Sequence, residues 1–321
     1  MMLNSSATAL EPSPVLIVGS VAFDSVETPL GREENVLGGA AVYASVSASF
    51  FAPVQIVGVV GTDFPKEHVE FLRARGIDTE GLQVAEGKTF RWSGYYDYDL
   101  NQAHTRQTDL NVFADFHPRL PESYRDARIV FLANIDPDLQ LEVLEQVRDP
   151  RLVVCDTMNF WIERKPERLR EVLRRVNLVF MNDAEARQFC GTFSLLRAAR
   201  DLLAMGPDGV IIKKGEHGAL LFTKGKHFSA PSYLLEQVAD PTGAGDTFAG
   251  GFVGYLAYTG DLSEANLRKA TVYGSVMASF NIQDFSLNRL RTLTQEEIAA
   301  RYEEFKEIAF FEAISASGET A

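Results

Sequence analysis

Residues 238–257 read VADPTGAGDTFAGGFVGYLA, and this stretch decides the fold. Asp240-Pro241 predicts a turn, because proline fixes its own φ and biases the preceding residue toward extended geometry. Gly243-Ala244-Gly245 follows with almost no side chain, and a helix-like run then continues through Tyr258. This order presents bare backbone N–H groups at a helix start. Such a start is a ready anion site, since those groups are unpaired and the helix dipole is positive there.

Asp246 lies at the start of this run and has two interpretations. It would repel a bound phosphate, but it could accept a proton from a hydroxyl group that attacks that phosphate. Alternatively, it is a first-turn acid that only stabilises its own helix, which is the favoured interpretation of a lone aspartate. The glycines next to Asp246 favour the chemical interpretation.

The composition is that of a soluble globular protein, with 46% apolar and 23% charged residues. A length of 321 residues allows one large α/β domain or two smaller ones. The net charge of −13 argues against a nucleic-acid or anionic-membrane partner, although a small phosphorylated ligand remains compatible with it. Only two cysteines occur, Cys155 and Cys190, which indicates a reducing compartment and leads us to expect a cytoplasmic protein.

No run of about 20 apolar residues is present to span a membrane. The first residues lack the basic segment and apolar core of a signal peptide. We therefore expect residues 1–13 and 313–321 to be frayed ends around a folded domain.

Buried strands alternate with helices along most of the chain. The predicted strands lie within residues 15–21, 53–61, 127–134, 151–156, 178–182 and 209–215. The predicted helices lie near residues 40–52, 65–76, 139–147, 166–176, 183–189, 194–205 and 244–258. This alternation indicates an α/β fold with a doubly wound, mainly parallel sheet flanked by helices.

Two segments depart from that rhythm. Residues 22–37 contain turn signals at Pro29 and Gly31 and read as a hairpin. Residues 82–116 are aromatic, threonine-rich and alternating, as expected of antiparallel strands. We therefore predict that the two segments form a small antiparallel sheet separate from the main one.

Several common motifs are absent. Residues 81–89 resemble a Walker A loop, but five residues separate the glycines where four are required, and no helical pattern follows. No GxGxxG follows the first strand, which leaves a nicotinamide site with little support. The sequence also has no HExxH, no GxSxG and no clustered Cys/His metal set.

The chain resembles the ribokinase-like, or PfkB, family of carbohydrate and nucleoside kinases. The family's C-terminal signature, D-T/P-T-G-A-G-D, is matched by DPTGAGD at residues 240–246, and this string is highly specific. The N-terminal signature is matched by Gly38-Gly39 before a small-residue helix and by Gly61-Thr62-Asp63. The resemblance covers residues 14–310 and implies one ribokinase-like domain. It also implies that residues 22–37 and 82–116 form a β-sheet lid over the sugar site.

The resemblance implies roles on the phosphate side. Asp246 matches the catalytic base, and Gly243, Ala244 and Gly245 match the anion hole for the γ-phosphoryl group of ATP. Asn182 and Glu185 match the N-x-x-E motif, which acts on Mg²⁺ and the phosphates mostly through water; otherwise Glu185 is an ordinary helix-start acid. The turn along the nucleotide is matched at the end of the strand near residue 213, by Lys213, Lys214, Gly215, Glu216 and Gly218. A lysine there could add a cation to the phosphates or simply be solvated.

The acceptor side rests on fewer residues. Asp24 matches an aspartate that holds two sugar hydroxyls, and Gly38 and Gly39 would bring backbone to the sugar. Tyr43 stands where family ribokinases have an asparagine, which suggests an acceptor that differs from ribose or is larger. The further candidates for acceptor contact are Asn134, Asp136 and the lid aromatics Phe90, Trp92, Tyr95 and Tyr96. Lid packing or a homodimer contact through the lid explains those aromatics equally well.

Asp240 and Thr242 match positions that help to hold a monovalent cation such as K⁺ in some family members. Three functional hypotheses follow from the resemblance. The first is ATP- and Mg²⁺-dependent phosphorylation of a hydroxymethyl group on a sugar or sugar-like acceptor. The second is a nucleoside kinase of the same fold, and the third is a catalytically silent regulator that binds nucleotide or sugar. The intact Asp246 argues against the third.

Overall fold

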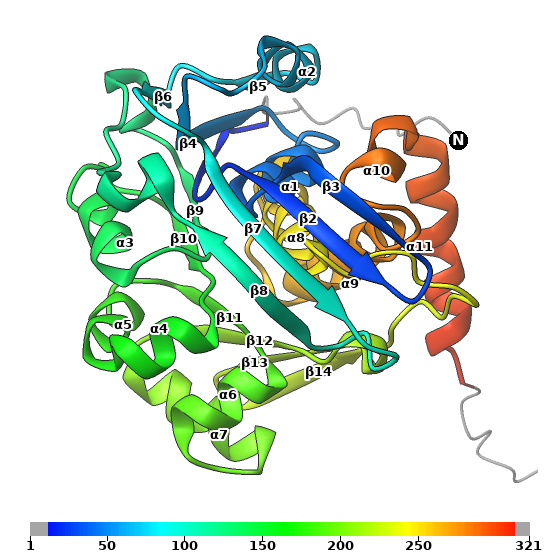
Figure 1. The fold of residues 1–321 in the computed structure, drawn as a ribbon. Helices are drawn as coiled ribbons and strands as arrows, with labels where there is room; N and C mark the ends of the chain where they lie inside the picture. The colour runs from blue at the N-terminus through cyan, green and yellow to red at the C-terminus, as the bar shows by residue number, and fades with distance from the viewer. Residues whose placement is uncertain (1–11, 312–321) are drawn as a thin grey trace, which may run out of the picture.

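The structure is a computed structural model that describes residues 12–311, so most of the two expected frayed ends lies outside the described residues. A ten-stranded sheet forms its centre, in the order β14-β13-β12-β11-β10-β9-β1-β4-β5, with β6 also paired to β4 (Figure 1). Its strands are β1 (Val15–Val18), β4 (Val54–Gly61), β5 (Ile77–Asp78), β6 (Leu82–Ala85), β9 (Ile129–Leu132), β10 (Leu152–Cys155), β11 (Leu178–Asn182), β12 (Gly209–Lys213), β13 (Ala219–Thr223) and β14 (Lys226–Ala230).

The pairing is parallel from β5 to β12, and only the pairings β12–β13 and β13–β14 at one edge are antiparallel. Side chains of β1 alternate between two apolar cores, with Val15 and Ile17 in one and Leu16 and Val18 in the other. A strand buried on both faces needs an apolar residue at every position, which is why these strands read as continuous apolar runs. The predicted doubly wound, mainly parallel sheet is confirmed.

Helices cover both faces of this sheet. The first core packs against α1 (Ala40–Ala48), α2 (Lys66–Ala74), α8 (Ala244–Thr259), α9 (Glu264–Asn281), α10 (Asn288–Thr292) and α11 (Gln295–Ala309). The second core packs against α3 (Pro137–Leu144), α4 (Asn159–Arg164), α5 (Pro166–Leu173), α6 (Asp183–Cys190) and α7 (Leu195–Met205). Three short 3₁₀ helices complete the described elements: η1 (Asn111–Asp115), η2 (Glu122–Tyr124) and η3 (Gly215–His217). Across residues 12–311, no helix is both long and apolar enough to cross a membrane.

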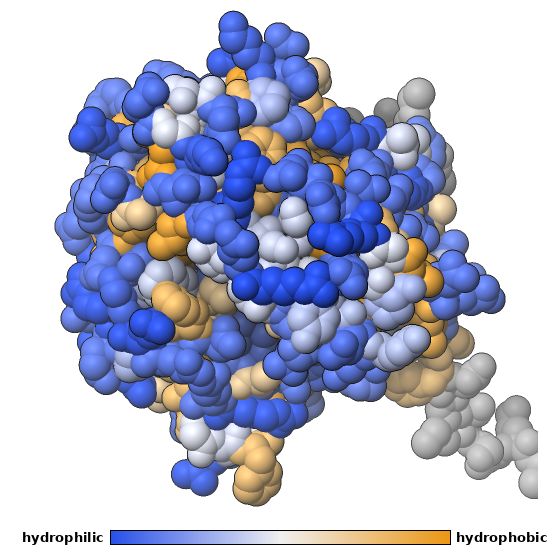
Figure 2. All heavy atoms as spheres, viewed as in Figure 1, coloured by the Kyte–Doolittle hydropathy of each residue, from blue (hydrophilic) through white to orange (hydrophobic). Residues whose placement is uncertain are grey.

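A separate four-stranded sheet lies in front of α8 in the view of Figure 1, in the order β3-β2-β7-β8. We call this sheet the lid. Its strands are β2 (Ala22–Thr28), β3 (Gly31–Gly38), β7 (Phe90–Tyr96) and β8 (Ala103–Asp109). The lid face seen in Figure 2 carries mostly hydrophilic residues.

The lid differs from the sequence prediction in two respects. Its two hairpins are antiparallel, but β2 and β7 pair in parallel, so the sheet is mixed and the prediction of a purely antiparallel sheet was wrong. Both strands leave the main sheet at the same edge and therefore run in the same direction. In addition, residues 82–85 form β6 and pair with β4, so the second hairpin begins only at Phe90.

Candidate active site

The glycine-rich stretch forms the start of α8. Gly243 is its N-cap and adopts a φ of 73°, a left-handed conformation that glycine accepts readily. Residues 241–246 are partly exposed, whereas most of the following helix is buried. Asp246 therefore lies in a first helical turn that is open to a ligand, beside amides that have no intrahelical acceptor.

Lys213 reaches this loop from the end of β12. A Cβ atom at Gly245 would lie 3.0 Å from its Nζ. The same Nζ donates to Asp156 Oδ2 at 2.6 Å, and the two side chains are only 17% and 4% exposed. Because β10 and β12 are parallel strands of one sheet, their carboxyl ends bring Asp156 and Lys213 to the edge where ligands bind in such folds.

Asn182 and Glu185 form a capping box at the start of α6. The Asn182 side chain accepts from the Glu185 amide at 2.8 Å, and the Glu185 carboxylate accepts from the Asn182 amide at 2.7 Å. Glu185 also lies near Asp156, Lys213 and Asp246, because the charges of all three act on its pKa. The motif thus caps the helix and places a carboxyl group near Asp246.

Burial shapes the electrostatics of these acids. Desolvation, followed by the negative charge of Asp156, raises the pKa of Asp246 to about 7, while Lys213 opposes the rise. The same two causes raise the pKa of Glu185 to about 7. A carboxylate with a pKa near neutrality is suited to accept a proton at physiological pH.

The turn after β12 contains η3 and two glycines with positive φ, Gly215 at 54° and Gly218 at 78°. A Cβ atom at Gly215 would collide with the side chain of Asn101, which lies between β7 and β8. The tip of the lid therefore touches the turn. The Glu216 side chain, in contrast, is mostly exposed.

The acceptor side gathers around Asp24 on β2, which is 5% exposed. A Cβ atom at Gly38 would overlap the Asp24 carboxylate, and one at Gly39 would lie 2.5 Å from the Ser20 carbonyl oxygen. Only glycines allow this close approach. Burial, then the charge of Asp240, raises the pKa of Asp24 to about 7.

Tyr43 lies beneath residues 243–246, the candidate catalytic loop, and is 1% exposed. A Cβ atom at Gly243 would lie 2.5 Å from its ring, so the ring supports the N-cap. The Tyr43 hydroxyl has no hydrogen-bond partner within residues 12–311. Burial, followed by the negative charges of Asp24 and Asp240, raises its pKa. This hydroxyl could therefore donate a hydrogen bond to a ligand that binds between Asp24 and Asp246.

The lid aromatics divide into two groups. Trp92 is in register with Asp24, and its ring lies across Gly94, so by strand alternation Trp92 and Tyr96 share a face. The Tyr96 hydroxyl meets Thr242 Oγ1 at 3.3 Å, which places this face toward the catalytic loop. Phe90 shares this face by the same alternation but stacks on Phe113, and Tyr95, on the opposite face, stacks on His104.

Two candidates follow β9. Asn134 is partly buried, and its Oδ1 has no partner in the described part of the chain. Asp136 caps α3 by accepting from the Asp138 amide at 2.9 Å and pairs with Lys165 at 2.7 Å. The Asp136 carboxylate is thus engaged in the fold, and the expectation that it contacts the acceptor has no support in its contacts.

Asp240 is 1% exposed and accepts from the Thr242 amide at 2.8 Å and the Ser286 amide at 3.2 Å. No ion pair to it occurs within residues 12–311, and burial raises its pKa. A buried carboxylate without a basic partner fits a site for a monovalent cation, because such a charge needs compensation.

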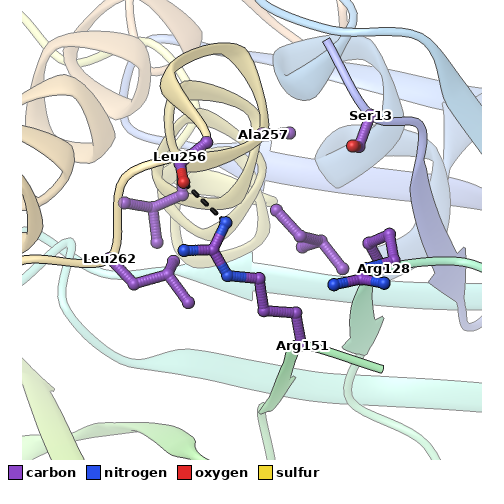
Figure 3. A pocket seen from close by; sticks show the side chains of 8 residues that line it. Ser13, Arg128, Arg151, Leu256, Ala257 and Leu262 are labelled. Atoms are coloured by element: carbon purple, nitrogen blue, oxygen red, sulfur yellow. Dashed lines mark hydrogen bonds between the residues drawn. The ribbon is translucent and has the colours of Figure 1, made fainter. Parts of the chain in front are cut away.

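A cavity of about 200 Å³ lies at the amino-terminal ends of β9 and β10, away from the strand ends that carry Asp156 and Lys213 (Figure 3). Arg128, Arg151 and the C-terminal end of α8 line it. Arg151 donates to the Gly260 carbonyl at 2.7 Å and so satisfies one of the helix's last carbonyl groups. The arginine in this cavity therefore caps the C-terminal end of α8, and the cavity lies at the other end of this helix from Asp246.

Comparison with known proteins identifies the family of the chain. Residues 15–292 match the pfkB family carbohydrate kinase domain. The chain belongs to the PfkB family of carbohydrate kinases. It is 34% identical over 244 residues to a cytidine kinase of Thermococcus kodakarensis, covering 74% of this chain and 87% of the relative.

A nucleoside kinase of Methanocaldococcus jannaschii is 27% identical to this PfkB kinase over 266 residues, covering 81% of this chain and 82% of the relative. The crystal structure of the nucleoside kinase from that organism superposes with a TM-score of 0.73 at 23% identity, covering 92% of this chain and 99% of the other. The fold is thus that of the ribokinase family. The PfkB kinase is an ATP-dependent enzyme that phosphorylates a sugar or nucleoside.

The residues of this PfkB kinase fit Mg²⁺ held through water. No cluster of three or more His, Cys, Asp or Glu side chains is arranged as a metal cage in residues 12–311. Mg²⁺ is usually held by one or two carboxylates together with substrate phosphates and several waters. Glu185 and Asp156, close to Lys213, supply carboxylates of that kind.

Asp156 was not among the predicted site residues, because residues 151–156 were predicted only as a strand. An acidic residue directly after a buried parallel strand is a usable signal, because that edge of the sheet binds ligands. Its partner Lys213 was recognised only through the resemblance.

Proposed function

We propose that this PfkB kinase transfers the γ-phosphoryl group of ATP to the hydroxymethyl group of a nucleoside, with cytidine as the first candidate. The observation that carries the proposal is the pair Trp92 and Tyr96 beside Asp24, on the lid face directed at the catalytic loop. An aromatic surface suits a planar base, since bases stack on aromatic rings. The cytidine and nucleoside kinases among the relatives support the same acceptor class.

Asp246 is the proposed catalytic base. It accepts the proton of the acceptor hydroxyl, whose oxygen bonds to the γ-phosphorus while the bond from phosphorus to the ADP oxygen breaks. The amides of Gly243 and Gly245 donate to the transferring group, joined by that of Ala244 once it leaves the Pro241 carbonyl, to which it donates at 3.2 Å. Lys213, held by Asp156 at 2.6 Å, adds a positive charge beside the loop.

On the acceptor side, Asp24 accepts hydrogen bonds from two hydroxyls of the sugar. Gly38 and Gly39 allow the sugar to approach the backbone. The Tyr43 hydroxyl and Asn134 Oδ1, both without a partner in residues 12–311, are available to an acceptor or to a water molecule that bridges to it.

The nucleotide lies along Lys213, Gly215 and the turn to Gly218, and the closed tip of the lid meets that turn at Asn101. Glu216 would contribute at the exposed rim. Asn182 and Glu185 would hold Mg²⁺ through water, and the ion would neutralise phosphate charge. Asp240 and Thr242 would hold a monovalent cation, for which K⁺ is the candidate.

The test is an ADP-release screen with cytidine, uridine, adenosine, inosine, ribose, fructose and myo-inositol at equal concentrations. We expect the highest kcat/KM with a nucleoside and a phosphorylated hydroxymethyl group in the product. A free sugar or inositol as the best acceptor would replace this proposal with the sugar-kinase hypothesis. ATP binding without turnover of any acceptor would favour the silent regulator.

Fluorescence gives a second, independent readout. The sequence has two tryptophans, Trp92 and Trp161, so Trp161→Phe leaves Trp92 as the sole reporter. We expect nucleosides, but not ribose, to quench it, because only the nucleoside carries a base to stack. Equal responses to both would contradict the assignment of Trp92 to the base.

A further inference from the structure

The Gly61-Thr62-Asp63 motif lies outside the active site, where the lid joins the main sheet. Gly61 ends β4, and a Cβ atom there would collide with the carbonyl of Gly87 and lie 2.5 Å from the Thr89 amide nitrogen. The glycine therefore lets residues 87–89 cross the end of β4 before they enter lid strand β7. Thr62 holds the same segment, because its amide donates to the Gly87 carbonyl at 3.0 Å.

Asp63 holds Thr89, the residue that precedes lid strand β7. Its Oδ1 accepts from the Thr89 amide at 2.7 Å and from the Thr89 hydroxyl at 2.6 Å. The Thr89 side chain is fully buried and accepts from the Gly61 amide at 3.0 Å. Asn111, where the chain returns from the lid, donates to the Thr89 carbonyl at 2.9 Å. Both ends of the second lid hairpin are thus tied at one point.

Arg91 connects Asp63 to two strands of the lid. Its guanidinium donates to Asp63 Oδ2 at 2.9 Å and to the side chain of Asn35 on β3, and it lies 4.8 Å from the centre of the Phe23 ring. Within residues 12–311, Arg91–Asp63 is the one ion pair between a lid strand and the rest of the molecule. The two side chains are 33% and 29% exposed, so water screens the pair only in part.

The contact lies next to the acceptor residue. Phe23 and Arg91 are register partners, and Asp24 and Trp92 are the next pair along the two strands. Asn35 lies in the irregularity of the β2–β3 pairing that follows Asp24, with a φ of 52°, and its amide donates to Ser25 Oγ at 3.1 Å. A movement of Arg91 would therefore shift the strand that presents Asp24.

We propose that Asp63 is a positioning residue: through Thr89 and Arg91 it holds the lid closed and sets the place of Asp24 and Trp92 over the acceptor. We call Asp63, Thr89, Arg91 and Asn35 the lid clamp. The clamp acts on the acceptor side and on exclusion of water, and the chemistry of Asp246 is unaffected by it. Closure of this kind keeps water from the transferred phosphoryl group.

The test compares Asp63→Asn with two matched controls. The variant keeps the shape of the side chain but loses its charge toward Arg91. Asp208→Asn breaks the exposed pair with Lys224 far from the lid, and Glu27→Gln breaks the pair with Arg106 inside the lid. For Asp63→Asn we expect the acceptor KM to rise on the order of tenfold, with kcat and the KM for ATP within about threefold of wild type. Both controls should behave as wild type.

Two further readouts separate positioning from a general loss of stability. The clamp variant should release more than one ADP per phosphorylated acceptor, because a loosened lid admits water. Amide hydrogen exchange should accelerate in β2 and β7 of the variant while the central strands keep their protection. Should Asp63→Asn fold poorly, Asn35→Gly, which tolerates the positive φ, should give the same changes at smaller size.

Unchanged acceptor KM, one ADP per product and unchanged exchange in β7 for both variants would overturn the proposal. The kinetic part rests on the proposed function, whereas hydrogen exchange needs no acceptor. A failed acceptor screen with accelerated exchange in β7 would therefore refute the function and leave the clamp intact. Normal turnover with unaltered exchange would refute only the clamp.

Discussion

Replacement of Asp246 by asparagine tests the proposed chemistry most directly. Asparagine keeps the size of the side chain and its place in the first turn of α8, but it cannot accept a proton. A positioned general base typically contributes about 10²–10⁴-fold to the rate, so kcat should fall by that factor. Loss of a negative charge beside the phosphates should leave ATP affinity unchanged or improve it.

The pH dependence of the activity gives a second test of Asp246 as the base. With a pKa of about 7, Asp246 is mostly protonated below neutrality, so wild-type kcat/KM should fall on the acid side of pH 7. The asparagine variant has no such group, and its residual activity should lose this limb. The ADP-release assay between pH 5.5 and 8.5 measures both profiles, with saturating acceptor and ATP for kcat.

The contribution of Asp246 to stability should change with pH in the direction opposite to that of an acid in a salt bridge. The folded-state pKa of Asp246 is raised above its unfolded value, so the native state binds the extra proton between about pH 4 and pH 7. Wild-type stability from this group is therefore greatest at acidic pH and declines as pH rises through 7. After allowance for the partial exposure of the side chain, the loss is roughly 1–2 kcal/mol.

Asp246→Asn should accordingly have a larger free energy of unfolding than wild type at pH 8, and the difference should shrink toward pH 5. Urea unfolding at both pH values measures it, with Asp208→Asn as a control for the substitution itself. A kcat within threefold of wild type would refute Asp246 as base, even if the stability difference appeared. A large loss of kcat without an acid limb in the wild-type profile would refute the pKa argument instead.

Three other variants probe the remaining parts of the site. Lys213→Met should lower kcat on the order of a hundredfold and destabilise the apo-enzyme, because it leaves Asp156 buried without its partner; steady-state kinetics and thermal melting measure the two effects. Asp240→Asn should abolish any stimulation by K⁺ over Na⁺ at equal ionic strength, whereas a stimulation that persists would place the cation elsewhere. Trp92→Leu should raise the nucleoside KM on the order of tenfold and leave the KM for ATP alone; an equal rise in both would assign Trp92 to lid closure.

The parallel strands β1, β4, β9, β10, β11 and β12 could be predicted from the sequence because each is a mainly apolar run. The short strand β5 and the edge strands β13 and β14 were not predicted. The mixed pairing of the lid could not be predicted either, since the parallel contact between β2 and β7 joins segments more than 60 residues apart. Alternating aromatic and threonine residues predict a strand, but they do not specify its neighbour or its direction. Similarly, residues 82–85 share the sequence pattern of the lid strands, yet they pair with β4 in the main sheet.

The start of α8, the proposed catalytic loop, was predictable for a different reason. Gly243, Gly245 and Asp246 lie within four positions of one another, so their relation is fixed by one helix start. The Lys213–Asp156 pair joins two strand ends 57 positions apart and depends on the register of the whole sheet. A group of residues that are close in the sequence can therefore be predicted from the sequence, whereas a group assembled from separate strands can be found only once the fold is known.

The same distinction bears on how the acceptor is selected. The proposed phosphate side is built from backbone and charge, which any acceptor would share. The proposed acceptor side is built from Asp24 and Trp92, which are register partners within the lid, and from Tyr43 on α1. Because Asp63 ties the lid to the end of β4, a change at the clamp can alter acceptor affinity without touching the acceptor or the catalytic loop. Variation in specificity among proteins with this loop should therefore be sought in the lid and its attachment as well as in the residues that contact the substrate.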